Sequence, residues 1–197
     1  MKEPYNPLSK INLARSIQGE ILACPLVGLG EVGRFDGAGI YALYYAGEFE
    51  VYAPLKASLL TSNPRPIYVG KAIPAGGRTG GLGSEAVRTL ALSQRLAKHA
   101  ASIKAAENLR LQDFQVRYLV VDDVWIPLGE NMLIETYQPV WNKLVAGFGN
   151  NPPGEGRRDQ QVSLWDVLHP GRSKNVSIGH QSATSAELQE RVRHFFT

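Results

Sequence analysis

Apolar positions in the first third of the chain predict a helix followed by a pair of strands. Residues 8–23 carry apolar side chains at helical spacing, and Pro25 ends the run. The β-branched and aromatic segment 39–45 predicts a strand, and the alternating segment 49–53, beyond a turn at Ala46–Gly47, predicts a second one. Both kinds of periodicity therefore occur within a short stretch of sequence.

The rest of the chain mixes short apolar runs with longer amphipathic ones. Further strands are predicted at 67–70 and 113–121. Helices are predicted at 54–62, 85–106 (with Ser84 as its cap), 128–138 and 185–196. Long loops are predicted at 73–84 and 147–160. Because strands and helices mix without a regular βαβ alternation, we expect an α+β fold, a small antiparallel sheet flanked by helices.

The composition fits a folded protein without a membrane span. Hydrophobic residues make up 44% of the 197 residues and charged residues 20%, which is too apolar for a disordered chain. No apolar run reaches the length of about 18 residues that a spanning helix needs. The single cysteine, Cys24, excludes an internal disulfide and a cysteine-based zinc site. The N-terminal residues lack the apolar stretch of a secretion signal, so we expect a cytoplasmic protein.

Charge is distributed unevenly, although the net charge is only +3. Residues 71–117 carry eight basic and three acidic side chains, whereas residues 118–142 carry four acidic and no basic ones. A basic block followed by an acidic block suits a polyanion-binding surface beside a cation-binding one. Solvated helix faces would produce the same distribution.

Two other motifs carry little weight. Gly28, Gly30 and Gly33 match a dinucleotide fingerprint, but Pro25 interrupts the strand that should precede it. His169 and His180 lack partners at metal-ligand spacing.

Four pieces of the sequence remain that could carry chemistry. They are Gly39–Tyr41 opening a strand, Tyr68–Lys71 ending another, Arg95 with His99 one helical turn apart, and Glu130 with Asn142 further on. Each piece has an ordinary structural explanation when it is taken alone: packing, a solvated face, a helix-start charge or a helix exit.

Together these residues resemble the GIY-YIG nuclease family, with GIY at 39–41, YVG at 68–70, and then the arginine, histidine, glutamate and asparagine in order. The resemblance covers residues 36–150, flanked by a helical extension at 1–35 and an extension at 151–197. The 27 residues from Tyr41 to Tyr68 mark 46–66 as an insertion of the kind found in type II restriction endonucleases. The stretches YVGKAIPAG, YQPVWN, GFGN and WDVLHPGR are similar to that branch.

The resemblance implies hydrolysis of a phosphodiester with one Mg²⁺ per active site. Glu130 would hold the metal, and Arg95 would bind phosphate oxygens. Tyr41 would deprotonate the attacking water, with Lys71 as the cation that favours its phenolate. Tyr68 and His99 would bind the phosphate or relay the proton, and Asn142 would lie near Glu130 and orient it.

The resemblance also implies double-stranded DNA as the partner and a homodimer that cuts a short palindrome. We expect segments 8–23 and 46–66 to make the dimer contact. The loop arginines Arg78, Arg157, Arg158 and Arg172 are candidates for reading guanine in a GC-containing site, although phosphate contact explains them equally well. A structure-specific or repair nuclease and a non-catalytic DNA-binding module are the alternatives.

Overall fold

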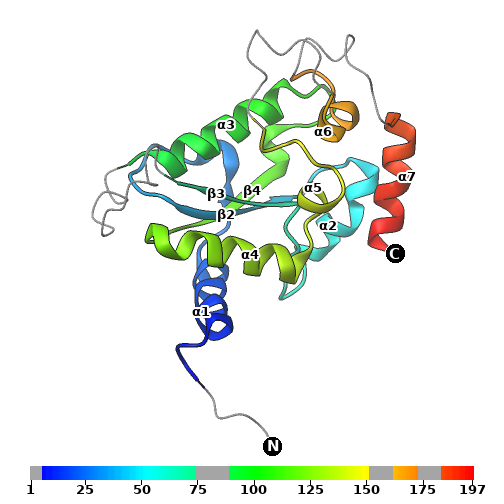
Figure 1. Cartoon of the computed structure of the whole chain (residues 1–197). Coiled ribbons are helices and arrows are strands. Elements are labelled where there is room, and N and C mark those ends of the chain that lie inside the picture. Colours follow the sequence, from blue (N-terminus) through cyan, green and yellow to red (C-terminus); the bar gives the residue numbers. More distant parts are fainter. Residues whose placement is uncertain (1–5, 74–88, 151–161, 173–182) are drawn as a thin grey trace, which may run out of the picture.

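A four-stranded antiparallel sheet in the order β1-β4-β2-β3 forms the centre of the computed structural model, which describes residues 6–73, 89–150, 162–172 and 183–197 (Figure 1). The strands are β1 (Val27–Gly28), β2 (Gly39–Tyr45), β3 (Tyr68–Ala72) and β4 (Phe114–Val120). All seven residues of β2 are buried, because the strand has a partner at each edge and apolar clusters cover both of its faces. The α+β class and the antiparallel sheet are as predicted.

Helices cover both faces of the sheet (Figure 1). Along β2, alternate side chains enter two separate apolar clusters, Tyr41 and Leu43 on one face and Ile40 and Ala42 on the other. The helix α4 (Ile126–Tyr137) covers the face of Ile40, together with α1 (Lys10–Ala23). The face of Tyr41 is covered by α3 (Ala91–Ala105), α5 (Val140–Lys143), α6 (Leu164–Leu168) and α7 (Ser185–Phe196).

The predicted strand at 49–53 is wrong. This segment is a 3₁₀ turn, η2 (Glu50–Tyr52), that leads into α2 (Ala53–Ser58). The reason is that β3 and β4 already occupy both edges of β2, so no edge is left for a hairpin partner. The Phe49 amide instead donates to the Tyr45 hydroxyl, at 2.8 Å.

The strand predicted at 39–45 and the helix predicted at 185–196 are found with the same ends, and the other predicted elements are found with shifted ends. The helix predicted at 85–106 is α3, and Ser84 lies outside the described residues together with most of the two predicted loops. Short elements were missed, namely β1, α5 and α6. Among the described residues, no helix is long and apolar enough to cross a bilayer.

Candidate active site

The two motif tyrosines meet Arg95 and His99 on the face of the sheet that α3 covers. The Tyr41 hydroxyl lies 2.6 Å from Nε2 of His99, and Arg95 Nε donates to the same hydroxyl at 3.4 Å. The Tyr68 ring lies 6.2 Å from the Tyr41 ring and 5.5 Å from the His99 ring, centroid to centroid. The structure therefore brings together four residues that are far apart in the sequence.

Two glycines make room for the tyrosine hydroxyls. Gly70 is the register partner of Tyr41, and a Cβ at Gly70 would overlap the Tyr41 hydroxyl. A Cβ at Gly149 would overlap the Tyr68 hydroxyl. The glycine of the YVG motif is thus a steric requirement of the GIY tyrosine, and the second glycine of GFGN serves Tyr68 in the same way.

The electrostatics of this group set the direction of its hydrogen bonds. Burial, reinforced by the charges of Arg95 and Arg172, lowers the pKa of His99 to about 3, so its imidazole is neutral. Arg95 can only donate, so Tyr41 accepts from Arg95. In the tautomer of the neutral His99 that carries its proton on Nδ1, Nε2 accepts the Tyr41 hydroxyl proton. Burial raises the pKa of Tyr41 well above its usual range, and Arg95 only partly offsets this rise.

Lys71 does not lie beside Tyr41, contrary to the expectation from the sequence. Side chains alternate along β3, so Lys71 projects from the face opposite to that of Tyr68 and Tyr41. There its ammonium forms an ion pair with Glu130 of α4, 2.7 Å from Oε2. The cation that contacts the Tyr41 hydroxyl is Arg95 instead.

Glu130 lies close enough to Tyr68 for its charge to act on that hydroxyl, although its ion pair with Lys71 is on the other face of β3. Burial raises the pKa of Tyr68, Arg95 lowers it, and the nearby Glu130 carboxylate raises it further. No cluster of three His, Cys, Asp or Glu side chains exists in the described ranges. A lone carboxylate fits Mg²⁺, which keeps several waters and takes its remaining oxygens from phosphate.

Asn142 contacts the strand that carries Tyr68 and not the Glu130 carboxylate. Its amide Nδ2 donates to the Val69 carbonyl, and its Oδ1 accepts from the Val69 amide, both at 2.8 Å. Trp141 donates its backbone amide to the Ile67 carbonyl just before. Asn142 thereby takes the place of a neighbouring strand on the open edge of β3 and holds the YVG segment.

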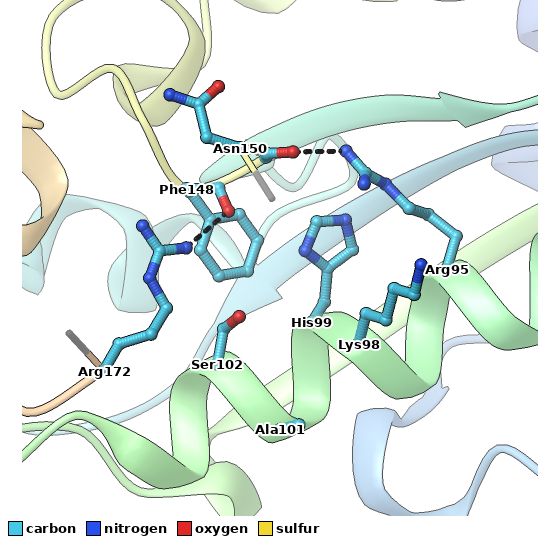
Figure 2. Close-up of a pocket in the computed structure, with 9 residues that line it drawn as sticks. Arg95, Lys98, His99, Ala101, Ser102, Phe148, Asn150 and Arg172 are labelled. Atoms are coloured by element: carbon cyan, nitrogen blue, oxygen red, sulfur yellow. Dashed lines mark hydrogen bonds between the residues drawn. The ribbon is translucent and has the colours of Figure 1, made fainter. Parts of the chain in front are cut away.

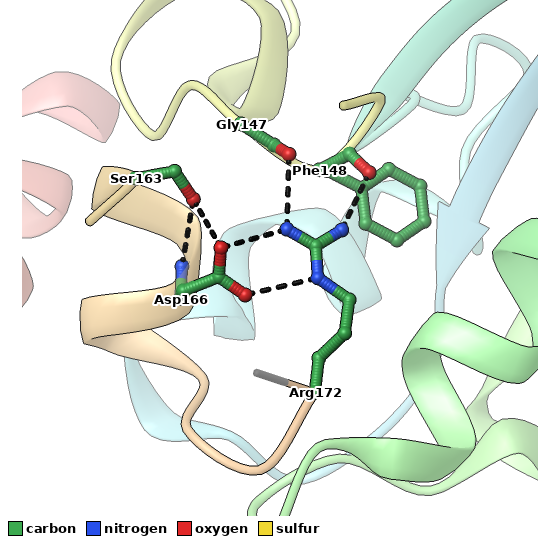
Figure 3. Close-up of polar contacts among 5 residues, drawn as sticks. All are labelled: Gly147, Phe148, Ser163, Asp166 and Arg172. Atoms are coloured by element: carbon green, nitrogen blue, oxygen red, sulfur yellow. Dashed lines mark hydrogen bonds and ion pairs between the residues drawn. The ribbon is translucent and has the colours of Figure 1, made fainter. Parts of the chain in front are cut away.

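Of the four loop arginines, only Arg172 lies in the described residues, and it contacts the protein itself (Figure 3). Its guanidinium forms two bonds with Asp166, at 2.9 and 2.8 Å, and donates to the carbonyls of Phe148 and Gly147. Arg95 holds the next carbonyl, that of Gly149, at 2.6 Å. Two arginines therefore fix the GFG turn, and base reading by Arg172 would require its ion pair to open.

A second buried network was missed by the sequence analysis. The Trp141 indole donates to the Tyr52 hydroxyl, which donates to His169 Nε2, each at 2.8 Å. His169 Nδ1 then donates to Asn108 Oδ1 at 2.9 Å. Burial lowers the pKa of His169 to about 3. The sequence could not predict this network, because the partners of His169 are Tyr52 and Asn108, which are distant in the sequence and form no metal-binding motif with it.

A GIY strand paired with a YVG strand, with an arginine and a histidine from the next helix over the two tyrosines, defines the class of GIY-YIG nucleases. Residues 33–196 match the family model described as the Eco29kI GIY-YIG domain, and the chain belongs to this family of restriction-type nucleases. The match runs past Asn150 and through α7. No curated protein matches the chain.

Proposed function

We propose that this chain is a type II restriction endonuclease that hydrolyses double-stranded DNA at a short palindromic site with Mg²⁺. The observation that carries the proposal is the Tyr41 hydroxyl, which is held between Arg95 and a neutral His99. A general base needs a route for the proton that it removes, and His99 offers one.

In the proposed reaction a water attacks the phosphorus atom while its proton passes to the Tyr41 oxygen. The proton of Tyr41 moves at the same time to His99 Nε2, so that no free phenolate is required. The incoming phosphate offsets the charges of Arg95 and Arg172 that lower the pKa of His99, which makes the imidazole a better acceptor. Breaking the bond to the 3′ oxygen completes the step, and that oxygen takes a proton from solvent.

Arg95 and Tyr68 bind the phosphate in this proposal. Arg95 donates through Nε to Tyr41 and through Nη2 to the Gly149 carbonyl, and its charge also lowers the pKa of Tyr68, so the guanidinium lies beside both tyrosines. Tyr68 is partly exposed, whereas Tyr41 is fully buried. Glu130 would hold the Mg²⁺, which supplies charge stabilisation for the phosphate and the leaving oxygen. Lys71 would then release Glu130 and neutralise phosphate charge.

The test is digestion of a plasmid with and without Mg²⁺ by the parent chain, Tyr41→Phe and Tyr44→Phe. Tyr44 is the matched control because it lies on the same strand, is equally buried and faces the other side of the sheet. We expect discrete fragments from the parent and from Tyr44→Phe, and a loss of about 10²-fold or more for Tyr41→Phe with DNA binding retained. Full activity of Tyr41→Phe would reject its role as the base.

The same digestion separates the other possibilities. Glu130→Gln should abolish the metal-dependent cleavage, and an unchanged Mg²⁺ dependence would reject its role as a ligand. Nicking of branched DNA alone would indicate a structure-specific nuclease. A gel shift without cleavage would indicate a binding module. A cleavage map confined to A·T pairs would remove the proposed guanine reading by Arg78, Arg157 and Arg158.

A homodimer is part of the proposal because one catalytic group per chain must cut two strands. The segments proposed for the contact present apolar side chains to solvent: Leu60 is 92% exposed and Ile11 is 49% exposed. Sedimentation of the parent should give the dimer mass, and Leu60→Glu or Ile11→Glu should shift it to the monomer. A parent that sediments as a monomer on DNA as well would contradict this part.

A further inference from the structure

A hollow of about 330 Å³ opens beside the catalytic group, along the exposed side of α3 (Figure 2). Arg95 and His99 line it, but neither motif tyrosine does, and neither does Glu130. It continues past Lys98 and Ser102 towards Arg172. The hollow therefore begins at the phosphate-binding arginine and extends away from the side on which the metal carboxylate lies.

The charge of the hollow is positive. Arg95, Lys98 and Arg172 line it, and among the residues that the structure describes no aspartate or glutamate does. In the described parts of the chain, Lys98 has no acidic partner within 4.0 Å, whereas the charge of Arg172 is balanced by Asp166. Lys98 is exposed, so its ammonium can reach an anion seated in the hollow.

The walls of the hollow are held in place before any ligand binds. Figure 2 shows Arg95 and Arg172 on opposite sides, with His99 and Phe148 between them. The rings of His99 and Phe148 stack at 4.5 Å, and the Arg172 guanidinium is fixed by Asp166 and by two carbonyls of the GFG turn. The side chain of Arg172 is only 10% exposed. A preorganised positive hollow costs little ordering when an anion enters it.

We infer that this hollow binds a second backbone phosphate of the DNA strand, adjacent to the one that is cut, through Lys98 and the hydroxyl of Ser102. The inference rests on the proposed function, since it takes Arg95 as the ligand of the scissile phosphate. Lys98 follows Arg95 by three residues, which places it about 4.5 Å further along the axis of α3 on a neighbouring face. One strand of DNA running along α3 would thus meet Arg95 and then Lys98.

The test compares Lys98→Glu with Lys104→Glu, which makes the same change of charge on the same helix. Lys104 is exposed like Lys98 but does not line the hollow. The affinity of each chain for a labelled mixed-sequence DNA duplex is measured by fluorescence anisotropy in EDTA, from about 50 to about 200 mM salt. A third variant, Ser102→Ala, removes the hydroxyl without changing the charge.

A plot of log K against log salt has a negative slope. We expect Lys98→Glu to make this slope less steep by about 0.9 or more, which is the contribution of one phosphate contact. Lys104→Glu should keep the parental slope, and Ser102→Ala should weaken binding with the slope unchanged. Equal losses for the two lysine variants would overturn the inference, because a general field of α3 would then explain them. Parental binding by Lys98→Glu would overturn it while leaving the proposed nuclease intact. A parent that binds no DNA would instead refute both.

Discussion

Acidification from pH 7.5 to pH 5 should destabilise this protein through two buried histidines. His99 and His169 are both fully enclosed, and burial lowers the pKa of each to about 3. In the unfolded chain each imidazole returns to the ordinary value of 6.5. The unfolded state therefore binds the extra protons as the pH falls, and the folded state does not.

The size of the effect follows from these values. Because the folded pKa lies below the unfolded one, the stabilisation is complete above pH 6.5 and is lost as the pH falls towards 3. At pH 5 an unfolded histidine is protonated by about 30 to 1, which costs the folded state about 2 kcal/mol per histidine. The two together give about 4 kcal/mol, a large part of the stability of an ordinary domain.

Urea unfolding at the two pH values measures this difference. His169→Gln should lose about half of the difference between pH 7.5 and pH 5, since one linked proton disappears. His194→Gln is the control, because His194 lies exposed on α7. Comparing each variant with itself at two pH values cancels any general destabilisation by the substitution. Free energies of unfolding within about 1 kcal/mol of each other at both pH values would refute the reasoning.

Three further outcomes follow from contacts at the site. Gly70→Ala places a Cβ on the Tyr41 hydroxyl, so cleavage should fall about 100-fold or more with a stability loss of about 1–3 kcal/mol; normal rates would contradict the steric argument. Asn142→Ala leaves the Val69 amide and carbonyl unpaired and should cost about 1–3 kcal/mol in urea, together with activity. Asp166→Ala leaves Arg172 without its carboxylate and should cost about 3 kcal/mol, whereas a parental unfolding midpoint would show that the pair contributes nothing.

Much of the sheet could be predicted because its strands have strong local signals. The segment 39–45 is rich in β-branched and aromatic residues, and it forms β2 with those same ends. Segment 49–53 has alternating apolar positions, which also predict a strand, but it does not form one. It cannot pair with β2 because β3 and β4 occupy both edges of that strand. This pairing depends on residues far away in the sequence, so the local pattern could not predict it.

The candidate site also has parts that the sequence predicted and parts that depend on the tertiary structure. The resemblance to the GIY-YIG family selected Tyr41, Tyr68, Arg95 and His99, which the structure brings together. Which cation lies beside Tyr41 depends on the face of the sheet, and counting along β3 from Tyr68 shows that Lys71 points the other way. Asn142 bonds to the backbone of Val69, and Arg172 bonds to two backbone carbonyls in addition to Asp166. Backbone groups are the same for every residue type, so the sequence could not predict these partners.

The covered border of β3 has a consequence for assembly. Exposed strands at the rim of a sheet are natural templates for pairing with another molecule. Here the Ile67 carbonyl and both backbone groups of Val69 are already bonded to Trp141 and Asn142. Pairing of β3 with a strand of a second copy would first have to break these bonds, so the covered border works against joining two sheets at Ile67 and Val69.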